Sequence, residues 1–132
     1  MNTTDFDEWN IKKQEINNKF VQIPFFKKRD IFCAQLGKNI GHEQNGKGKE
    51  FLRPIIVLRK FNPNIFLCIP LTSKLKENKY HFKFTVGSKV MMAILSQARL
   101  IDSKRLKRKM GEIDKENFKK LIRKSRKIFF NT

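Results

Sequence analysis

A predicted hairpin brings together an arginine and a threonine, two residue types that bind phosphate. Two apolar runs, 55–58 and 65–69, flank the turn-forming group Asn62-Pro63-Asn64. A hairpin symmetric about the Asn62–Pro63 bond places Arg53 directly opposite Thr72, whereas a loop of odd length would break that pairing. Directly opposed residues have Cβ atoms about 4.5–5.5 Å apart. The guanidinium and the hydroxyl would then converge on one spot that suits a phosphate ester.

Arg53, Thr72 and His42 each have an ordinary interpretation as well as a chemical one. An arginine can hold two phosphate oxygens at once, but Arg53 is also one of 30 Lys and Arg residues. Thr72 could hold a phosphate or simply be a hydroxyl at the end of a strand. His42 lies in a glycine-containing loop and could titrate near neutral pH, although a lone loop histidine is more often an ordinary polar residue. The residues alone leave both interpretations open.

The charge of the chain favours a polyanionic partner. Lys and Arg number 30 against 12 Asp and Glu, which gives a formal net charge of +18. Such a chain attracts polyanions, and nucleic acid is the commonest polyanion in a cell. The alternative is a solvated basic surface without a ligand. With 132 residues and 39% hydrophobic content, the chain has room for one compact domain with a real core.

The sequence carries no sign of a membrane or of secretion. No apolar stretch approaches the roughly 20 residues that span a bilayer. The N-terminus carries Asp5, Asp7 and Glu8 in place of the basic and apolar segments of a signal peptide. Cys33 and Cys68 lie in apolar runs without metal-type spacing, which favours small buried side chains in a reducing cytosol over a disulfide. We expect a cytoplasmic protein with no membrane partner.

The N-terminal segment is predicted to be an amphipathic helix. Between Thr4 and Phe20 several apolar side chains share one face, and Thr3 or Thr4 could cap the helix. The apolar set is Phe6, Trp9, Ile16 and Phe20. Residues 1–25, a helix and a connector, form an extension to the domain that follows. We expect Trp9 to cover an edge or an end of that domain; an interaction arm is the alternative.

Residues 26–132 are predicted to form a mainly β domain. Strands are expected at 30–36, 55–58, 65–69, 80–86, 90–95, 99–101 and 107–113, with one helical turn at 102–106. The Gly/Asn/Lys-rich segment 37–50 is a loop of the kind that carries function. Asp114 is expected to cap a C-terminal helix. Short strands that close on themselves between helices predict an α+β fold: a small SH3-like β-barrel with a C-terminal helix and an extra N-terminal helix.

Five motifs, in this order, resemble the MazF/PemK/Kid toxins, which are the toxin halves of bacterial type II toxin–antitoxin pairs. They are Phe-Lys-Lys-Arg-Asp-Ile-Phe-Cys-Ala-Gln-Leu at 26–36, Gly-His-Glu-Gln at 41–44, Leu-Arg-Pro at 52–54, Pro-Leu-Thr-Ser at 70–73 and Ser-Gln-Ala-Arg-Leu-Ile-Asp-Ser-Lys-Arg-Leu at 96–106. Each motif alone is weak, but five in register are hard to produce by chance. The resemblance covers residues 26–130.

The resemblance implies the SH3-like fold, a homodimer and a sequence-selective, metal-independent endoribonuclease. Such an enzyme cleaves single-stranded RNA to 2′,3′-cyclic phosphate and 5′-hydroxyl ends. The resemblance makes Arg53 and Thr72 the catalytic pair. It also implies neutralisation by an antitoxin with an acidic, partly disordered tail, which a charge of +18 would attract. RNA contacts are expected from His42, Gln44, Ser73, Ser96, Gln97 and Arg99.

Two positions depart from the family pattern. Ser96 stands where many relatives carry an acidic residue, and serine is not a base near neutral pH without an activating neighbour. Ile94 stands where some relatives carry an arginine that could assist the leaving group. The general base and general acid are therefore unassigned. The alternative function is a catalytically weak or inactive module of the same fold that binds RNA or DNA.

The sequence lacks the residue clusters of metal-dependent nucleases. It has no zinc-type Cys/His cluster and no dense group of Asp and Glu that could hold two Mg²⁺ ions. We therefore expect neither a metal nor another cofactor. Catalysis is instead expected to be acid–base and electrostatic, with Arg53, Thr72 and His42 as the candidate residues. Single-stranded RNA suits the chain better than a duplex, because its bases can splay into a groove and be read on their edges.

Overall fold

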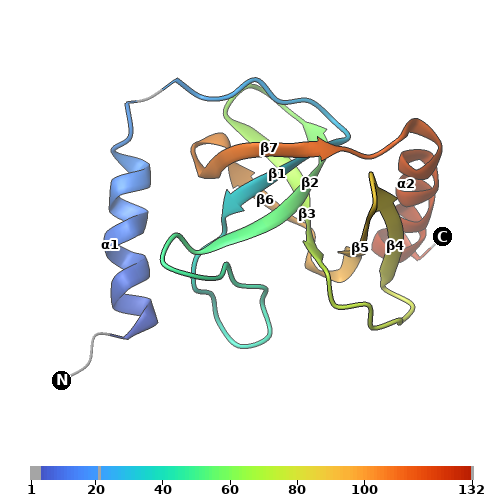
Figure 1. Ribbon diagram of the computed structural model, residues 1–132, viewed down its shortest axis with the longest axis horizontal. Helices are drawn as coiled ribbons and strands as arrows, with labels where there is room; N and C mark the ends of the chain where they lie inside the picture. The colour runs from blue at the N-terminus through green and yellow to red at the C-terminus, as the bar shows by residue number, and fades with distance from the viewer. Residues whose placement is uncertain (1–3, 21, 132) are drawn as a thin grey trace.

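The structure is a computed structural model that describes residues 4–20 and 22–131 (Figure 1). In chain order its elements are α1 (Asp5–Asn17), β1 (Asp30–Gln35), β2 (Leu52–Lys60), β3 (Ile65–Thr72), β4 (His81–Val86), β5 (Lys89–Ile94), η1 (Leu95–Gln97), β6 (Arg99–Asp102), η2 (Ser103–Arg105), β7 (Leu106–Glu112) and α2 (Lys115–Phe130). The α+β class and the predicted strands are confirmed. Thr3, one of the two predicted helix caps, lies outside the described residues.

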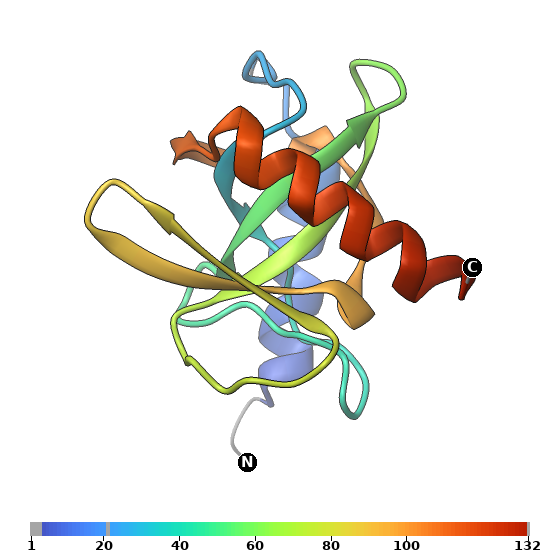
Figure 2. The ribbon, with the colours of Figure 1, turned by 90° about the vertical axis from the view of Figure 1, so that its right-hand side faces the viewer.

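The strands form one antiparallel sheet in the order β4-β5-β3-β2-β1-β7. One edge of β3 pairs with β2, while its other edge is divided, because residues 65–68 pair with β6 and residues 71–72 with β5. The expected closed barrel is wrong: in the described part of the chain, no pairing joins β4 to β7. The helix α2 lies across the sheet (Figure 2), and its Phe118 and Leu121 pack between the β4–β5 hairpin and the central strands. The helix therefore joins the β4–β5 hairpin to the central strands through side-chain packing.

Both faces of the central strands β1, β2 and β3 are buried. Successive residues of β2 alternate between two apolar clusters: Ile56 and Leu58 join the cluster that contains α2, whereas Ile55 and Val57 join the other. Burial on both faces explains why the run 55–58 is continuously apolar. A third, small cluster joins α1 to the end of the sheet and consists of Trp9, Ile16 and Phe51.

The turn of the β2–β3 hairpin differs from the symmetric prediction. Lys60 pairs with Phe66, which centres the turn on Pro63 and not on the bond that precedes it. The side-chain oxygen of Asn62 accepts hydrogen bonds from the backbone N–H groups of Asn64 and Ile65. This Asx-type turn suits the Asn-Pro-Asn sequence.

A bulge at Leu58 then shifts the hairpin register by one residue, so that Ile55 pairs with Pro70. Two residues further along, the same register would place Arg53 opposite Thr72. The two strands separate before that point, because Arg53 pairs with Ala34 on β1 and Thr72 pairs with Met92 on β5. Arg53 and Thr72 are therefore not ladder partners, which corrects the expected direct opposition.

The helix α1 is shorter and less buried than predicted. Thr4 caps it: its hydroxyl accepts a hydrogen bond from the Asp7 N–H at 3.1 Å, and the Asp7 carboxylate accepts one from the Thr4 N–H. The helix ends at Asn17, so Phe20 lies beyond it and is fully exposed. Within the predicted apolar face, Trp9 and Ile16 are buried. Trp9 covers an end of the sheet, as expected.

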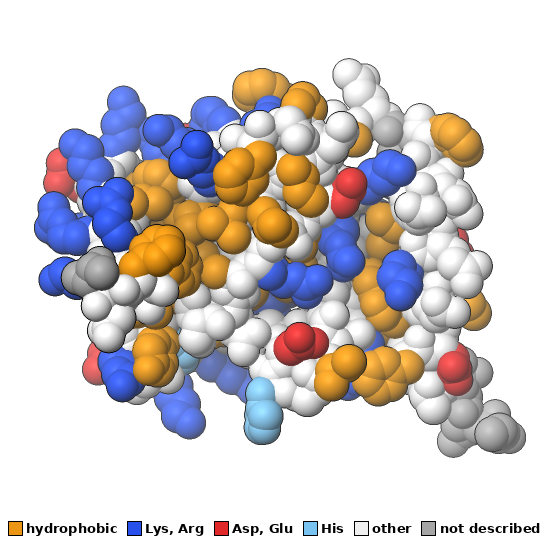
Figure 3. Space-filling view, turned by 180° about the vertical axis from the view of Figure 1, so that it is seen from behind, with side chains coloured by type: hydrophobic (Ala, Val, Ile, Leu, Met, Phe, Trp, Pro, Cys, Tyr) orange, Lys and Arg blue, Asp and Glu red, His pale blue; other side chains and the backbone are white. Residues whose placement is uncertain are grey.

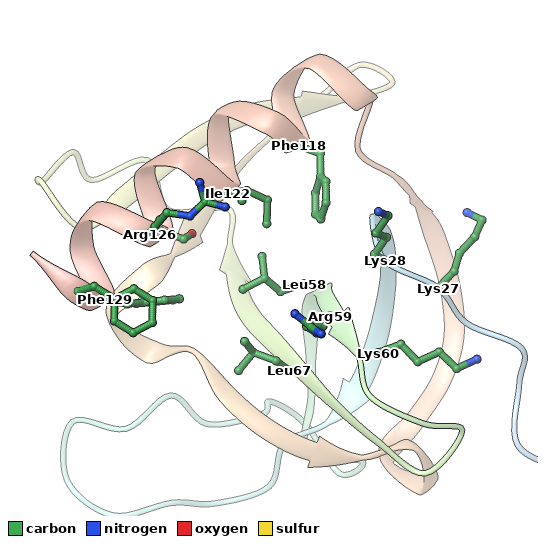
Figure 4. Close-up of a pocket in the computed structure, with 12 residues that line it drawn as sticks. Lys27, Lys28, Leu58, Arg59, Lys60, Leu67, Phe118, Ile122, Arg126 and Phe129 are labelled. Atoms are coloured by element: carbon green, nitrogen blue, oxygen red, sulfur yellow. The ribbon is translucent and has the colours of Figure 1, made fainter. Parts of the chain in front are cut away.

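The helix α2 and the strands β2 and β3 enclose an apolar groove with a basic rim, which we call the α2 groove (Figure 4). Asp114 caps α2, as predicted. The groove has a volume of about 610 Å³. Its apolar residues are Leu58, Leu67, Phe118, Ile122, Phe129 and Phe130, and its cations are Lys27, Lys28, Arg59, Lys60 and Arg126. Seen from behind, Lys and Arg side chains gather around hydrophobic ones at the end of the molecule that carries α2 (Figure 3).

The two cysteines are free and buried, so the disulfide alternative is absent. Burial raises the pKa of Cys68 to about 12, and it also raises the pKa of Cys33.

We predict that neither thiol of the native protein reacts with a disulfide reagent at about pH 8, and that both react after unfolding. An unfolded thiol ionises at about pH 8.5, whereas the buried thiols stay protonated. The free energy of unfolding therefore falls as the pH rises above that of the unfolded thiol. Cys68→Ala should reduce this alkaline slope, and a reactive native thiol would contradict the prediction.

Candidate nucleic-acid site

The loop between β1 and β2, residues 37–50, is folded back on itself. The side-chain amide of Asn39 donates to the carbonyls of Leu36 at 3.1 Å and Gln44 at 2.9 Å. The Asn39 N–H in turn donates to the side-chain oxygen of Asn45. Gly41 has a φ of 56°, a left-handed conformation that glycine adopts without strain. These local bonds give the loop a defined shape in place of regular secondary structure.

Gln97 holds the loop from outside. Its side-chain oxygen accepts a hydrogen bond from the Gln44 N–H at 3.3 Å, and its side-chain nitrogen donates to the His42 carbonyl at 3.1 Å. Gln97 lies in the short 3₁₀ turn η1, which strand patterns did not predict. This turn leaves Ser96 exposed while Gln97 reaches the loop. One side chain thus fixes the backbone on both sides of Glu43.

The loop and the η1 turn enclose a cavity of about 500 Å³, which we call the loop pocket. It is lined by Asn39, His42, Glu43, Gln44, Pro70, Ser96, Gln97, Ala98 and Arg99. Most of the predicted RNA-contact residues, all except Ser73, therefore meet in one place. Their amide, imidazole and guanidinium groups offer donors and acceptors to the edge of a base. Motif reasoning did not single out Asn39 and Glu43, although both belong to the same loop.

Arg53 links this loop to β3. Its Nε donates to the Asn45 carbonyl at 2.6 Å and its Nη1 to the Leu71 carbonyl at 3.1 Å. These contacts use two of the five N–H donors of a guanidinium, so others remain for a ligand. Burial lowers the pKa of Arg53 below its ordinary value. The group nevertheless stays cationic, because an arginine does not deprotonate in proteins.

Arg53 and Thr72 share a second, smaller cavity of about 160 Å³, which we call the arginine pocket. It is lined by Lys47, Leu52, Arg53, Pro54, Leu71, Thr72, Ser73, Lys89 and Met91. The Thr72 hydroxyl accepts a hydrogen bond from the Lys74 N–H at 3.1 Å, which leaves its own proton free to donate. The predicted convergence of Arg53 and Thr72 is therefore present, although strand pairing does not produce it. Lys47 and Lys89, which sequence reasoning missed, add two cations.

The two pockets are neighbours that share two walls. The loop borders the loop pocket through Gln44 and the arginine pocket through Lys47. The end of β3 borders the first through Pro70 and the second through Thr72. A chain that occupies both would place one group near the Gln97 amide and a phosphate near the Arg53 guanidinium.

The two departures from the family pattern lie in different surroundings. Ile94 is buried and its side chain is 6% exposed, so it offers nothing to a ligand. Ser96 is exposed and lines the loop pocket together with His42 and Glu43. Glu43 also accepts a hydrogen bond from the Ile40 N–H at 2.9 Å. Glu43 is thus the one carboxylate among the residues that line the loop pocket.

Within residues 4–20 and 22–131, no three His, Cys, Asp or Glu side chains come together in a way that could hold a metal ion. None of the described helices is long and apolar enough to cross a membrane.

Comparison with protein families decides what kind of protein carries these pockets. A family model described as the PemK-like, MazF-like toxin of type II toxin–antitoxin systems matches residues 27–129. The chain belongs to this family. The matched segment contains both pockets and the α2 groove, with the exception of Phe130. The helix α1 of this PemK/MazF-like toxin lies outside the match.

Solved structures support the fold. MazF from Deinococcus radiodurans, in its crystal form I, is 17% identical with a TM-score of 0.65 and covers 83% of this chain and 98% of its own. The Mycobacterium tuberculosis toxin MazF-mt6 is 15% identical with a TM-score of 0.59 and covers 76% of this chain and 96% of its own. At these identities the likeness shows the fold alone. A search of curated proteins gives no sequence match.

The clamp made by Gln97 leads to a test of the loop. We predict that Gln97→Ala increases the hydrogen-exchange rate of the Gln44 amide by about five- to tenfold, because a typical hydrogen bond contributes about 1 kcal/mol. Ser96→Ala, at the neighbouring exposed position, is the control and should leave that rate unchanged. Equal exchange in the two variants would show that Gln97 does not hold the loop.

Proposed function

We propose that this PemK/MazF-like toxin is a sequence-selective, metal-independent endoribonuclease. Its substrate is single-stranded RNA, which it cleaves in the cytoplasm to 2′,3′-cyclic phosphate and 5′-hydroxyl ends. The observation that carries the proposal is the arginine pocket, where Arg53 and Thr72 meet beside the loop pocket. The arginine pocket includes the cations Lys47 and Lys89, and none of its lining residues is acidic. A phosphate is the ligand that such a pocket suits best.

In the proposed reaction, the 2′-oxygen attacks phosphorus and the bond from phosphorus to the 5′-oxygen breaks. The proton of the 2′-hydroxyl passes to a base, and the 5′-oxygen takes a proton from an acid. The Arg53 N–H groups and the Thr72 hydroxyl bind the phosphate oxygens, where negative charge develops. His42 and Glu43 in the loop pocket are our candidates for the proton transfers, since Ser96 and Ile94 cannot serve.

Recognition of single-stranded RNA fits the shape of the loop pocket. A cavity of about 500 Å³ accommodates an unstacked base, and the amides of Gln44 and Gln97 and the guanidinium of Arg99 border it. Ser73, in the arginine pocket, lies nearer the proposed phosphate. The surrounding charge of +18 attracts the RNA backbone, so affinity should fall steeply with salt.

A second candidate function is a module of the same fold that binds RNA or DNA without cleaving it. Two observations favour it: the buried side chain of Ile94 and the hydroxyl of Ser96 supply neither an acid nor a base. The charge and the two pockets serve binding equally well. Only a cleavage experiment separates the two functions.

We further propose that the toxin is a homodimer and that an antitoxin with an acidic tail neutralises it. The α2 groove suits such a tail, since five cations surround an apolar floor (Figure 4). The hydroxyl of Ser125 also lines this groove, and it is buried without a hydrogen-bond partner among the described residues. A monomer by sedimentation at micromolar concentration would contradict the dimer.

The cleavage test uses mixed-sequence single-stranded RNA in EDTA. We predict cleavage by the wild-type protein and a loss of about 10²–10³ in rate in Arg53→Ala, the range seen when one preorganised donor is removed. Fragment ends are mapped to identify the cyclic phosphate. Arg123→Ala, which removes one exposed cation from α2, is the matched charge control and should keep nearly full activity.

Two outcomes would contradict this proposal. Intact RNA bound tightly by the wild-type protein would favour the binding module. Equal cleavage by wild type and Arg53→Ala would indicate a contaminating nuclease. Because Arg53 also anchors the loop, Thr72→Val serves as an independent variant: it removes the hydroxyl and preserves the strand, and it should lower the rate while leaving RNA affinity within a few-fold.

The groove is tested with a synthetic acidic peptide that carries leucine and phenylalanine among its carboxylates. We predict that Arg126→Glu lowers its affinity about tenfold, the change expected from about 1.4 kcal/mol. Arg123→Glu, on the same helix but outside the groove, is the control. Fluorescence anisotropy measures both. Equal losses would show that the peptide senses only the overall charge.

A further inference from the structure

We propose that α1 positions the loop 37–50, and that Trp9 is the residue through which it does so. The helix lies outside the segment that matches the toxin family, so the family does not assign it a role. The consequence for RNA rests on the proposed function, because the loop carries His42, Glu43 and Gln44 of the loop pocket. The proposal is that α1 holds the root of this loop, whereas Gln97 and Arg53 hold its middle at residues 42–45.

Trp9 packs directly on the first residue of the loop. A Cβ atom added to Gly37 would lie 2.0 Å from Cε2 of Trp9, so the indole ring rests on the backbone at that point. Gly37 also has a φ of +82°, which disfavours any other residue. Close approach and backbone conformation both require glycine here. The indole therefore makes a close packing contact with Gly37 of the loop, and this contact is more specific than general coverage of the surface.

The same indole contacts the residue that follows the loop. The rings of Trp9 and Phe51 lie 5.3 Å apart, centroid to centroid, at 54°. Phe51 has a φ of 56°, which is uncommon for an aromatic residue. The Gly37 N–H donates to the Phe51 carbonyl at 3.3 Å and closes the root of the loop. Trp9 thus bridges the two ends of the loop at the point where they meet.

Polar contacts add to the packing of α1 against the domain. The Arg105 guanidinium lies 5.7 Å from the Trp9 ring, and its Nη1 donates to the carbonyl of Gln35 at the end of β1. Lys12 of α1 pairs with Glu50, the last residue of the loop, at 3.4 Å. The other carboxylate oxygen of Glu50 accepts a hydrogen bond from the Gln35 side chain at 2.9 Å. The helix therefore contacts the first and last residues of the loop, Gly37 and Glu50, and Phe51 just after it.

The apolar contacts of α1 are separate from the main core. Trp9, Ile16 and Phe51 form a cluster of their own, distinct from the two clusters that hold the sheet together. Loss of the indole should therefore loosen the loop without unfolding the sheet. An ordered loop binds its ligand more tightly, because the entropy of ordering does not have to be lost on binding. This is the physical reason to expect an effect on RNA affinity.

The experiment compares Trp9→Ala with Ile11→Ala, an exposed apolar position on the same helix. We expect amide exchange in residues 38–48 to become about tenfold faster in Trp9→Ala, while the strands β1 and β2 are unchanged. With single-stranded RNA, KM should rise about five- to tenfold and kcat should stay within about twofold, since binding and not chemistry is affected. Ile11→Ala should match the wild type in both measurements. Trp9→Phe, which keeps an aromatic ring on Gly37, should lie between them.

Each outcome decides the matter. Equal loop exchange in Trp9→Ala and Ile11→Ala overturns the proposal, as does a looser loop with an unchanged KM. If Trp9→Ala does not fold, the exchange rates of Trp9→Phe against Ile11→Ala decide in its place. If the wild-type protein neither binds nor cleaves RNA, the proposed function fails, and the exchange comparison still shows whether α1 orders the loop.

Discussion

The half-buried charge of Arg53 is the constraint on which the arrangement of the site depends. A guanidinium removed from water must be hydrogen-bonded, and here the carbonyls of Asn45 and Leu71 supply the partners. One carbonyl belongs to the loop and the other to β3. Satisfying the charge therefore ties the loop to the sheet beside the arginine pocket. Arg53, which we propose for catalysis, therefore also helps to form the pocket in which it lies.

The loop is held at three points by contacts of different kinds. Arg53 and Gln97 bind its backbone near the pockets through hydrogen bonds, and Trp9 packs on its root through an aromatic surface. Irregular segments of this length need such ties, because they lack the repeated backbone bonds of helices and strands. The loop is therefore shaped by residues from three separate parts of the chain: α1, β2 and the η1 turn. Its geometry is a property of the whole fold.

Local patterns predicted the elements well, because each depends on neighbouring residues. Apolar runs located the strands, Asp114 located the start of α2, and Thr4 located the start of α1. The same reasoning extended α1 to Phe20, which is fully exposed, because periodicity carries no information on what a face packs against. It missed the η1 turn and Glu43, whose importance comes from what lies across from them. It also missed Lys47 and Lys89 among many other cations.

The sequence by itself determined the α+β class, the order of elements, the basic character and most of the polar residues that line the loop pocket. It could not decide closure of the sheet, because that depends on whether β4 and β7, which are far apart in the sequence, form backbone hydrogen bonds with each other. It placed Arg53 opposite Thr72 through a register that ends two residues too early. The tertiary structure brings them into one pocket by another route, through the separate partners of β2 and β3 and the carbonyls that Arg53 needs. This arrangement depends on long-range packing and on the free-energy cost of burying the Arg53 charge without hydrogen bonds. Neither can be inferred from residues that are neighbours in the sequence.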